Sequence, residues 1–197
     1  LTGDVMLGRL MNDVLRERGA AYPWGNTLPI LQGAGLTIMN LECVITAGGR
    51  PWTRWPKVFH FQADPIAMES LQVAGADCVL LANNHTLDYE YEGLLEMLDR
   101  LSHAGIAYTG AGRDLEEARR PAVLEAGGLR LGILAFTDNE PGWAASEGRP
   151  GTNYLPVSTE PEQLDRMRES IARTRALGAD LVLVSNHWGP NMRLRPS

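Results

Sequence analysis

Short apolar runs alternate along the chain with longer stretches in which apolar residues recur every three or four positions. The short runs are almost continuously hydrophobic, which is typical of strands buried on both faces of a sheet. The longer stretches predict amphipathic helices. The predicted strands are 4–7, 35–41, 76–82, 130–137 and 179–186, and the predicted helices are 8–19, 65–75, 91–105 and 160–178. This alternation predicts an α/β fold in which helices flank a largely parallel sheet.

Local signals refine this prediction. The segment 121–136 is expected to form a β-hairpin that turns at Gly127-Gly128. Ser158 or Thr159 is expected to cap the last helix, with Pro161 in its first turn. Two long irregular segments remain, 47–65 and 137–156, of which the first is expected to end in a short strand over 57–62. Loops of this length within a compact domain are usually functional or mobile.

Composition narrows the class of protein. A length of 197 residues and a hydrophobic fraction of 44% suit one domain over 1–197 with a sizeable core. The net charge of −6 and the absence of a Lys/Arg-rich run argue against a nucleic-acid partner. No apolar run approaches the roughly 20 residues that cross a bilayer, so we expect no membrane segment in this chain. Cys43 and Cys78 lack the spacing of a metal-binding pair.

Polar residues follow the apolar runs, at the points where the predicted strands end. In open α/β sheets, ligands bind at the carboxyl ends of the strands. Carboxylate and amide oxygens suit hard cations, and imidazole suits manganese, iron, nickel or zinc. The residues concerned are Asp4, Asn40, Glu42, Asn83, Asn84, His85, Thr137, Asp138, Asn139, Asn186 and His187. Together they predict a divalent-metal site at one sheet edge.

Each of these signals has a plainer interpretation. Asn83, Asn84 and His85 are also compatible with a turn in which an asparagine caps the next helix. His187 alone is compatible with an ordinary hydrogen-bonded histidine, and Asp4 with a capping residue. Four segments that end in such residues, together with Asp4 at the first strand, nevertheless favour a functional edge.

Four motifs in order resemble the CapA family of poly-γ-glutamate (capsule) synthesis proteins. They are "GDVMLGR", "NLECVIT", "ANNHTLDY" and "SNHWG". The fold of that family is similar to the calcineurin-like metallophosphoesterases. The resemblance therefore implies an α/β sheet sandwich, flanked by helices, with one or two divalent ions, Mn, Fe or Zn, at the strand ends.

The resemblance also implies roles for individual residues. His85 and His187 are expected to move protons during catalysis. Asn40, Asn83 and Asp88 are expected to support the metal ligands without binding the metal. The implied metal ligands are Asp4, Glu42, Asn84, His85 and His187, and the implied substrate-binding residues are Arg9, Arg54 and Lys57.

Two departures from the related phosphoesterases qualify this assignment. Those enzymes begin with Asp-x-His, whereas the third position here is Met6, which argues against ordinary phosphatase activity. The family also continues past its "HWG" motif to a further histidine cluster. We therefore expect the chain to be an N-terminal portion of the domain, with its site incomplete and the C-terminal histidine motif absent.

Two classes of function stay open. The first is a metal-dependent hydrolase that acts on a phosphoester or on a peptide-like amide carbonyl, with epimerase chemistry at an acidified Cα–H as a variant. The second is a non-catalytic capsule-assembly component that binds an anionic polymer or partner proteins. Arg50, Arg54 and Lys57, interleaved with Trp52 and Trp55, suit such a ligand, although the tryptophans are equally compatible with packing on the sheet. The resemblance points to the cell envelope, and a cytoplasmic location stays open.

Overall fold

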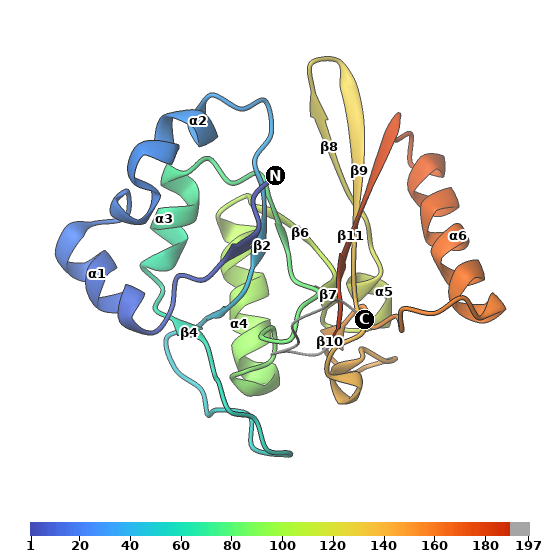
Figure 1. Ribbon diagram of the computed structural model, residues 1–197, viewed down its shortest axis with the longest axis horizontal. Coiled ribbons are helices and arrows are strands. Elements are labelled where there is room, and N and C mark those ends of the chain that lie inside the picture. The colour runs from blue at the N-terminus through green and yellow to red at the C-terminus, as the bar shows by residue number, and fades with distance from the viewer. Residues whose placement is uncertain (190–197) are drawn as a thin grey trace. The chain divides into compact units, whose positions relative to one another are not determined.

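The computed structural model describes residues 1–189 and has the predicted α/β class (Figure 1). Its internal contacts divide the chain into two units. The first comprises Leu1–Leu80 and His85–Tyr108, and the second comprises Leu81–Asn84 and the chain from Thr109 onward. The division passes between Asn84 and His85, within one of the predicted site motifs.

The first unit is built on a sheet with the strand order β1-β2-β5-β6. Parallel pairing joins β1 to β2 and β2 to β5. The residues of β2 and β5 are all buried, as their continuous hydrophobicity predicted. The strands are β1 Asp4–Val5, β2 Ile38–Leu41, β5 Cys78–Leu80 and β6 Ala107–Thr109, with a separate parallel pair, β3 Val44–Ile45 and β4 Gln62–Ala63.

The longer helices of the first unit lie in the segments that periodicity predicted to be helical. Figure 1 shows α1, α2 and α3 gathered together, with α4 apart from them. The buried face of α4 consists of apolar residues and one glycine, which is the arrangement that its periodicity predicted. The helices are α1 Leu10–Arg18, η1 Tyr22–Thr27, α2 Leu28–Gln32, α3 Ala67–Val73 and α4 Glu90–His103.

The second unit is built on a three-stranded sheet with the order β11-β9-β8. Strand β11 runs parallel to β9, and β8 runs antiparallel to it. The predicted hairpin turn at Gly127 and Gly128 is confirmed, with φ angles of 59° and 78° that glycine adopts without strain. The elements are α5 Leu115–Ala118, β8 Ala122–Ala126, β9 Leu129–Thr137, η2 Pro141–Trp143, α6 Pro161–Ala176 and β11 Leu181–His187, with a small antiparallel pair, β7 Ala111–Gly112 and β10 Gly151–Thr152.

A glycine in β9 allows α6 to pack closely on this sheet. A Cβ atom at Gly132 would lie 2.2 Å from Cγ2 of Thr174 on α6 and 2.9 Å from Cβ of Ala179. Elsewhere on α6, Met167 and Ile171 pack against a core cluster that includes Phe136 of β9. The close approach of helix and sheet therefore depends on the absence of a side chain at position 132.

Two local predictions were wrong. The residue that precedes α6 is Glu160, and neither Ser158 nor Thr159 caps the helix, because the Ser158 hydroxyl accepts a hydrogen bond from the Glu160 N–H, just outside the helix. Pro161 does occupy the first turn. The strand expected over 57–62 is reduced to Gln62–Ala63, because only that part of the loop pairs with β3.

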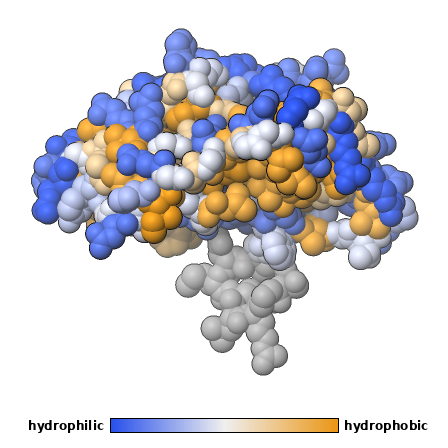
Figure 2. Space-filling model, turned by 90° about the horizontal axis from the view of Figure 1, so that it is seen from above, coloured by the Kyte–Doolittle hydropathy of each residue, from blue (hydrophilic) through white to orange (hydrophobic). Residues whose placement is uncertain are grey.

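The described surface carries both polar and apolar side chains. Figure 2 shows hydrophobic residues among hydrophilic ones on one face. Large exposed apolar side chains include Leu10, Ile30 and Val58. Within residues 1–189, no helix combines the length and the apolar character needed to cross a membrane.

Candidate metal centre

Asn40 joins two carboxylates at neighbouring strands of the first unit. Asp4 opens β1 and stands in register with Asn40 on β2, and Glu42 follows the end of β2. The Asn40 side-chain amide donates to Oδ1 of Asp4 at 2.7 Å and to Oε2 of Glu42 at 2.6 Å. One carboxylate oxygen of Asp4 lies within 4.8 Å of one of Glu42. The parallel register thus brings together three of the polar residues that the sequence predicted at one sheet edge.

The environment of Glu42 disfavours its charged form. Burial raises its pKa from 4.5 to about 7, and the nearby charges of Asp4 and Asp88 contribute to the rise, while the Asn40 hydrogen bond and Lys57 oppose it. Asp4 itself is exposed, so the pair consists of one buried and one exposed carboxyl group. Like charges held close together in this way are typical of sites that receive a cation. A divalent ion would relieve both the repulsion and the cost of burial.

The imidazole of His85 is held at its edge and on its face. Its Nδ1 lies 2.5 Å from Oδ2 of Asp88, and the same oxygen accepts the Phe61 backbone N–H at 2.7 Å. The Phe61 ring stacks on the imidazole with 3.8 Å between centroids and 16° between planes. Because an ionised carboxylate only accepts hydrogen bonds, Nδ1 carries the proton in the neutral ring, and the lone pair stays on Nε2. That tautomer is the one that a metal ligand or a proton acceptor at Nε2 needs.

Asp88 also has a cationic partner. Nζ of Lys57 lies 3.3 Å from Oδ1 of Asp88, and the two side chains are 7% and 0% exposed. Asp88 thus holds the His85 ring, and its supporting role at a metal site stays a prediction. The ion pair with Asp88 also gives Lys57, which was predicted to bind substrate, a structural contact inside the protein.

The other two predicted substrate-binding residues are exposed to solvent. The Arg54 side chain is 55% exposed and pairs with Glu90 at 3.3 Å. Arg9 has a φ of 56°, which is uncommon for a residue with a side chain. Its guanidinium lies 5.6 Å from the centroid of the Phe61 ring. Arg9 therefore approaches the ring that stacks on His85.

The second unit holds the other predicted ligands. Nε2 of His187, the last residue of β11, lies 2.9 Å from Oδ1 of Asn84. In its backbone contacts, the Asn83 N–H donates to the Leu81 carbonyl. Asp138 shapes the loop after β9, since its Oδ1 accepts from the Asn139 side chain and from the Gly189 N–H.

The predicted metal ligands are therefore divided between the two units. Asp4, Glu42 and His85 belong to the first unit, and Asn84 and His187 belong to the second. The contribution of Phe61 was not predicted. The sequence analysis placed Phe61 only within the short strand expected over 57–62, and the stacking follows from the fold.

The whole chain is similar to a family of bacterial capsule proteins. The model of the family described as "Bacterial capsule synthesis protein PGA_cap" matches residues 1–197. A "Probable polyglutamine synthesis accessory protein" of Mycobacterium tuberculosis is 30% identical over 229 residues, which cover 97% of this chain and 60% of the relative. The "Capsule biosynthesis protein CapA" of Bacillus anthracis is 27% identical, over 100% of this chain and 47% of the relative. The "PGA biosynthesis protein CapA" of Bacillus subtilis is 28% identical, over 98% of this chain and 50% of the relative.

The chain thus spans about half to 60% of the length of the curated relatives that it matches. Because the family model covers the chain from Leu1 to Ser197, the chain belongs to the bacterial capsule synthesis protein family PGA_cap.

Proposed function

We propose that this chain carries the metal-binding part of a metal-dependent hydrolase that serves capsule or poly-γ-glutamate synthesis. The bond attacked would be a phosphoester or a peptide-like amide of an anionic substrate. The observation that carries the proposal is the pair of carboxylates, Asp4 and Glu42, held by one Asn40 amide in surroundings that raise the pKa of Glu42 to about 7.

The donor set fits a divalent ion. Asp4 and Glu42 offer carboxylate oxygens, and His85 offers an imidazole nitrogen whose tautomer is set by Asp88. Mixed oxygen and nitrogen donors suit manganese, iron or zinc, as one ion or two. When bound, such an ion would polarise a carbonyl or phosphoryl oxygen and make a water molecule more acidic.

Residues of this chain would bind the substrate and move the proton. His85 is the first choice for proton transfer, because Asp88 and Phe61 fix its ring. His187 is the second, with Asn84 as its partner. The part of Asn84 and His187 in metal binding stays a prediction. Arg9 and Arg54 are exposed cations able to meet an anionic substrate.

The decisive experiment is metal content measured by elemental mass spectrometry on the purified protein. We expect stoichiometric manganese, iron or zinc that falls several-fold in His85→Ala. The matched control is His103→Ala, an exposed histidine at the end of α4. An absence of metal after loading with each ion, or equal content in the two variants, would contradict the proposal. A positive result justifies assays on phosphoesters and γ-glutamyl amides, with Cα epimerisation followed in parallel.

One observation favours a second candidate, a non-catalytic component that binds an anionic polymer. At the position where phosphoesterases carry a histidine ligand, Met6 instead accepts the Gly8 N–H through its sulfur at 3.2 Å. This candidate predicts that Arg54→Glu weakens polymer binding in metal-free protein, whereas Arg175→Glu, an exposed change on α6, does not. Lys57 is unsuitable for this test because its side chain is buried against Asp88. Unchanged binding in Arg54→Glu would dismiss the candidate.

A further inference from the structure

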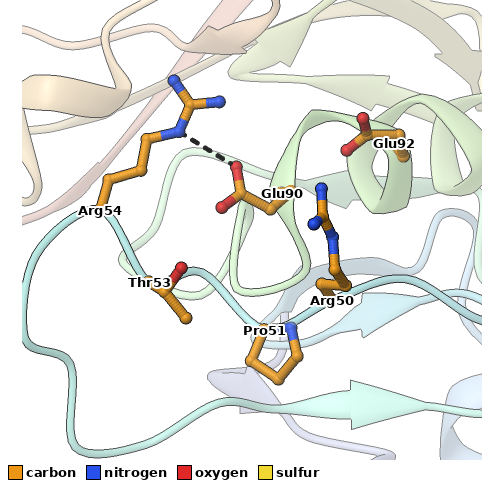
Figure 3. A pocket seen from close by; sticks show the side chains of 6 residues that line it. All are labelled: Arg50, Pro51, Thr53, Arg54, Glu90 and Glu92. Atoms are coloured by element: carbon orange, nitrogen blue, oxygen red, sulfur yellow. Dashed lines mark hydrogen bonds and ion pairs between the residues drawn. The ribbon is translucent and has the colours of Figure 1, made fainter.

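A concave site lies in the first unit, and its lining includes Arg54 but none of the proposed metal ligands. It is a pocket of about 490 Å³ between the loop around Arg50–Arg54 and the first turn of α4 (Figure 3). Its lining residues are Arg50, Pro51, Thr53, Arg54, Glu90 and Glu92. Four of the six carry charge, two of each sign, so the pocket presents both cations and anions to a ligand.

Arg54 is oriented in advance of any ligand. Its Nε lies 3.3 Å from Oε2 of Glu90, and its guanidinium lies 5.0 Å from the centroid of Trp52 and 4.9 Å from that of Tyr91. Within residues 1–189, its two terminal nitrogens have no hydrogen-bond partner, and Figure 3 shows them pointing away from Glu90. A guanidinium fixed in this way is suited to bind a carboxylate through two parallel hydrogen bonds.

Arg50 and Glu92 provide the remaining charges. Neither has an ion-pair partner in the described part of the chain. Figure 3 shows the Arg50 side chain reaching toward the two carboxylates of α4. After the Arg54–Glu90 pair is set aside, the pocket offers one cation and one anion. A ligand with a single net charge would leave one of them uncompensated, and a zwitterion would not.

The backbone at Glu90 is also unusual. This residue has a φ of 56°, although glycine is the residue that tolerates such an angle. Non-glycine residues in this region cluster at ligand sites, where the surrounding structure holds them. The angle sets Glu90 at the start of α4, where its carboxylate meets Arg54.

We propose that this pocket binds a small zwitterion with a carboxylate and an ammonium group on one carbon, as in a free α-amino acid. Arg50 supplies the charge that balances the carboxylate, the terminal nitrogens of Arg54 donate hydrogen bonds to it, and Glu92 takes the ammonium. The pocket needs no metal and does not rest on the hydrolase proposal. It differs from a simple anion-binding loop because Glu92 repels a ligand that has lost its ammonium.

The test is a titration of the ¹⁵N-labelled protein, pre-treated with chelator, with three probes. They are L-alanine, N-acetyl-L-alanine, which lacks the ammonium, and L-alaninamide, which lacks the carboxylate. We expect saturable amide shifts from L-alanine at millimolar concentration, centred on residues 50–54 and 90–92, since ion pairs at exposed sites are weak. We expect at least five-fold weaker binding of the other two probes. Glu92→Gln and Arg50→Gln should each weaken the binding of L-alanine by a similar factor of at least five.

Matched controls separate this site from general charge effects. Glu69→Gln on α3 and Arg175→Gln on α6 change exposed charges outside the pocket and should leave the affinity unchanged. The proposal is overturned if L-alanine shows no saturable shift, if Glu92→Gln binds as wild type does, or if N-acetyl-L-alanine binds as well as L-alanine. The last result would identify an anion-binding loop. Since metal is removed, failure of the metal site leaves this outcome unaffected.

Discussion

The carboxylate of Asp88 holds the imidazole of His85, with 2.5 Å between Oδ2 and Nδ1. The same carboxylate is fully buried and also contacts the Phe61 N–H and the Lys57 ammonium. A single side chain therefore connects the histidine of one motif to the long loop between β3 and β4. Removing its charge should affect both.

Asp88→Asn should destabilise the protein strongly. It removes the carboxylate that pairs with the buried Lys57, and loss of one partner of a buried ion pair costs about 3–5 kcal/mol in the free energy of unfolding. Chemical denaturation measures the change. Asp165→Asn, in an exposed pair with Arg168 on α6, is the control and should change stability by under about 0.5 kcal/mol. Equal effects of the two substitutions would contradict the importance assigned to Asp88.

Lys57 and Asp88 should be energetically coupled. If their contact is the main role of Lys57, then Lys57→Met and Asp88→Asn together should cost less than the sum of the two single changes, because the double change leaves neither member of the pair facing a missing partner. A double-mutant cycle by chemical denaturation measures this coupling. We expect about 1–3 kcal/mol, as for residues in direct contact. Additive effects would instead return Lys57 to the list of substrate-binding residues.

Asp4 and Glu42 should control metal content. Asp4→Asn and Glu42→Gln each remove one charge of the carboxylate pair that Asn40 holds, and bound divalent metal should fall at least ten-fold without unfolding the chain. Elemental analysis gives the metal content, and circular dichroism checks the fold. Glu69→Gln serves as the exposed control. Full metal content in Asp4→Asn would remove Asp4 from the site.

Glu42 should make the metal-free protein less stable as pH rises. Burial raises its folded-state pKa to about 7 from 4.5, so the folded state binds a proton more tightly than the unfolded state. This contribution is complete below pH 4.5 and is lost as pH rises to about 7. The loss is on the order of 3 kcal/mol, from about 1.4 kcal/mol per pKa unit.

Denaturation with chelator present, at several values of pH, measures this dependence. Glu42→Gln cannot ionise, so its stability relative to the wild type should improve between about pH 4.5 and pH 7.5. Parallel stability curves for the two proteins would show that the Glu42 carboxyl titrates normally in the folded state.

Gly132→Ala should weaken the packing of α6 on the sheet. The added Cβ would lie 2.2 Å from the Thr174 methyl group, and Thr174 is fully buried, so helix or strand must shift. Overpacking of this kind costs about 1–3 kcal/mol. Thermal denaturation measures this loss of stability. Gly48→Ala, where the added atom meets nothing within 4 Å, is the control and should be nearly neutral. If the Gly132→Ala protein is as stable as the Gly48→Ala protein, α6 can shift away from the added methyl group at little cost in stability.

Local sequence patterns predicted the main helices and strands of this protein. The five predicted strands and four predicted helices all appear, since hydrophobic periodicity reports directly which side of an element is buried. The hairpin at Gly127-Gly128 was equally predictable from its turn residues. By contrast, α2, η1 and α5 were missed because their segments are short and carry little periodicity.

Part of the candidate site was likewise predictable from the polar residues at strand ends. Asp4, Asn40 and Glu42 were expected at a sheet edge, and the parallel register of β1 with β2 does bring them together. Which of them contact each other was not predictable from the sequence. The Asn40 amide bridge depends on side-chain orientation across two strands 36 residues apart in sequence.

What the sequence by itself determined was the α/β class, the main elements, the family and the polar residues gathered at strand ends. Only the tertiary structure decided their partners: Asp88 for Lys57, Phe61 for His85, and Glu90 for Arg54. The physical reason is that periodicity and turn chemistry act over a few residues, whereas each of these contacts joins the long loop after β3 to the segment that leads into α4. The path of an irregular loop follows from the packing of the whole unit, which no local pattern encodes.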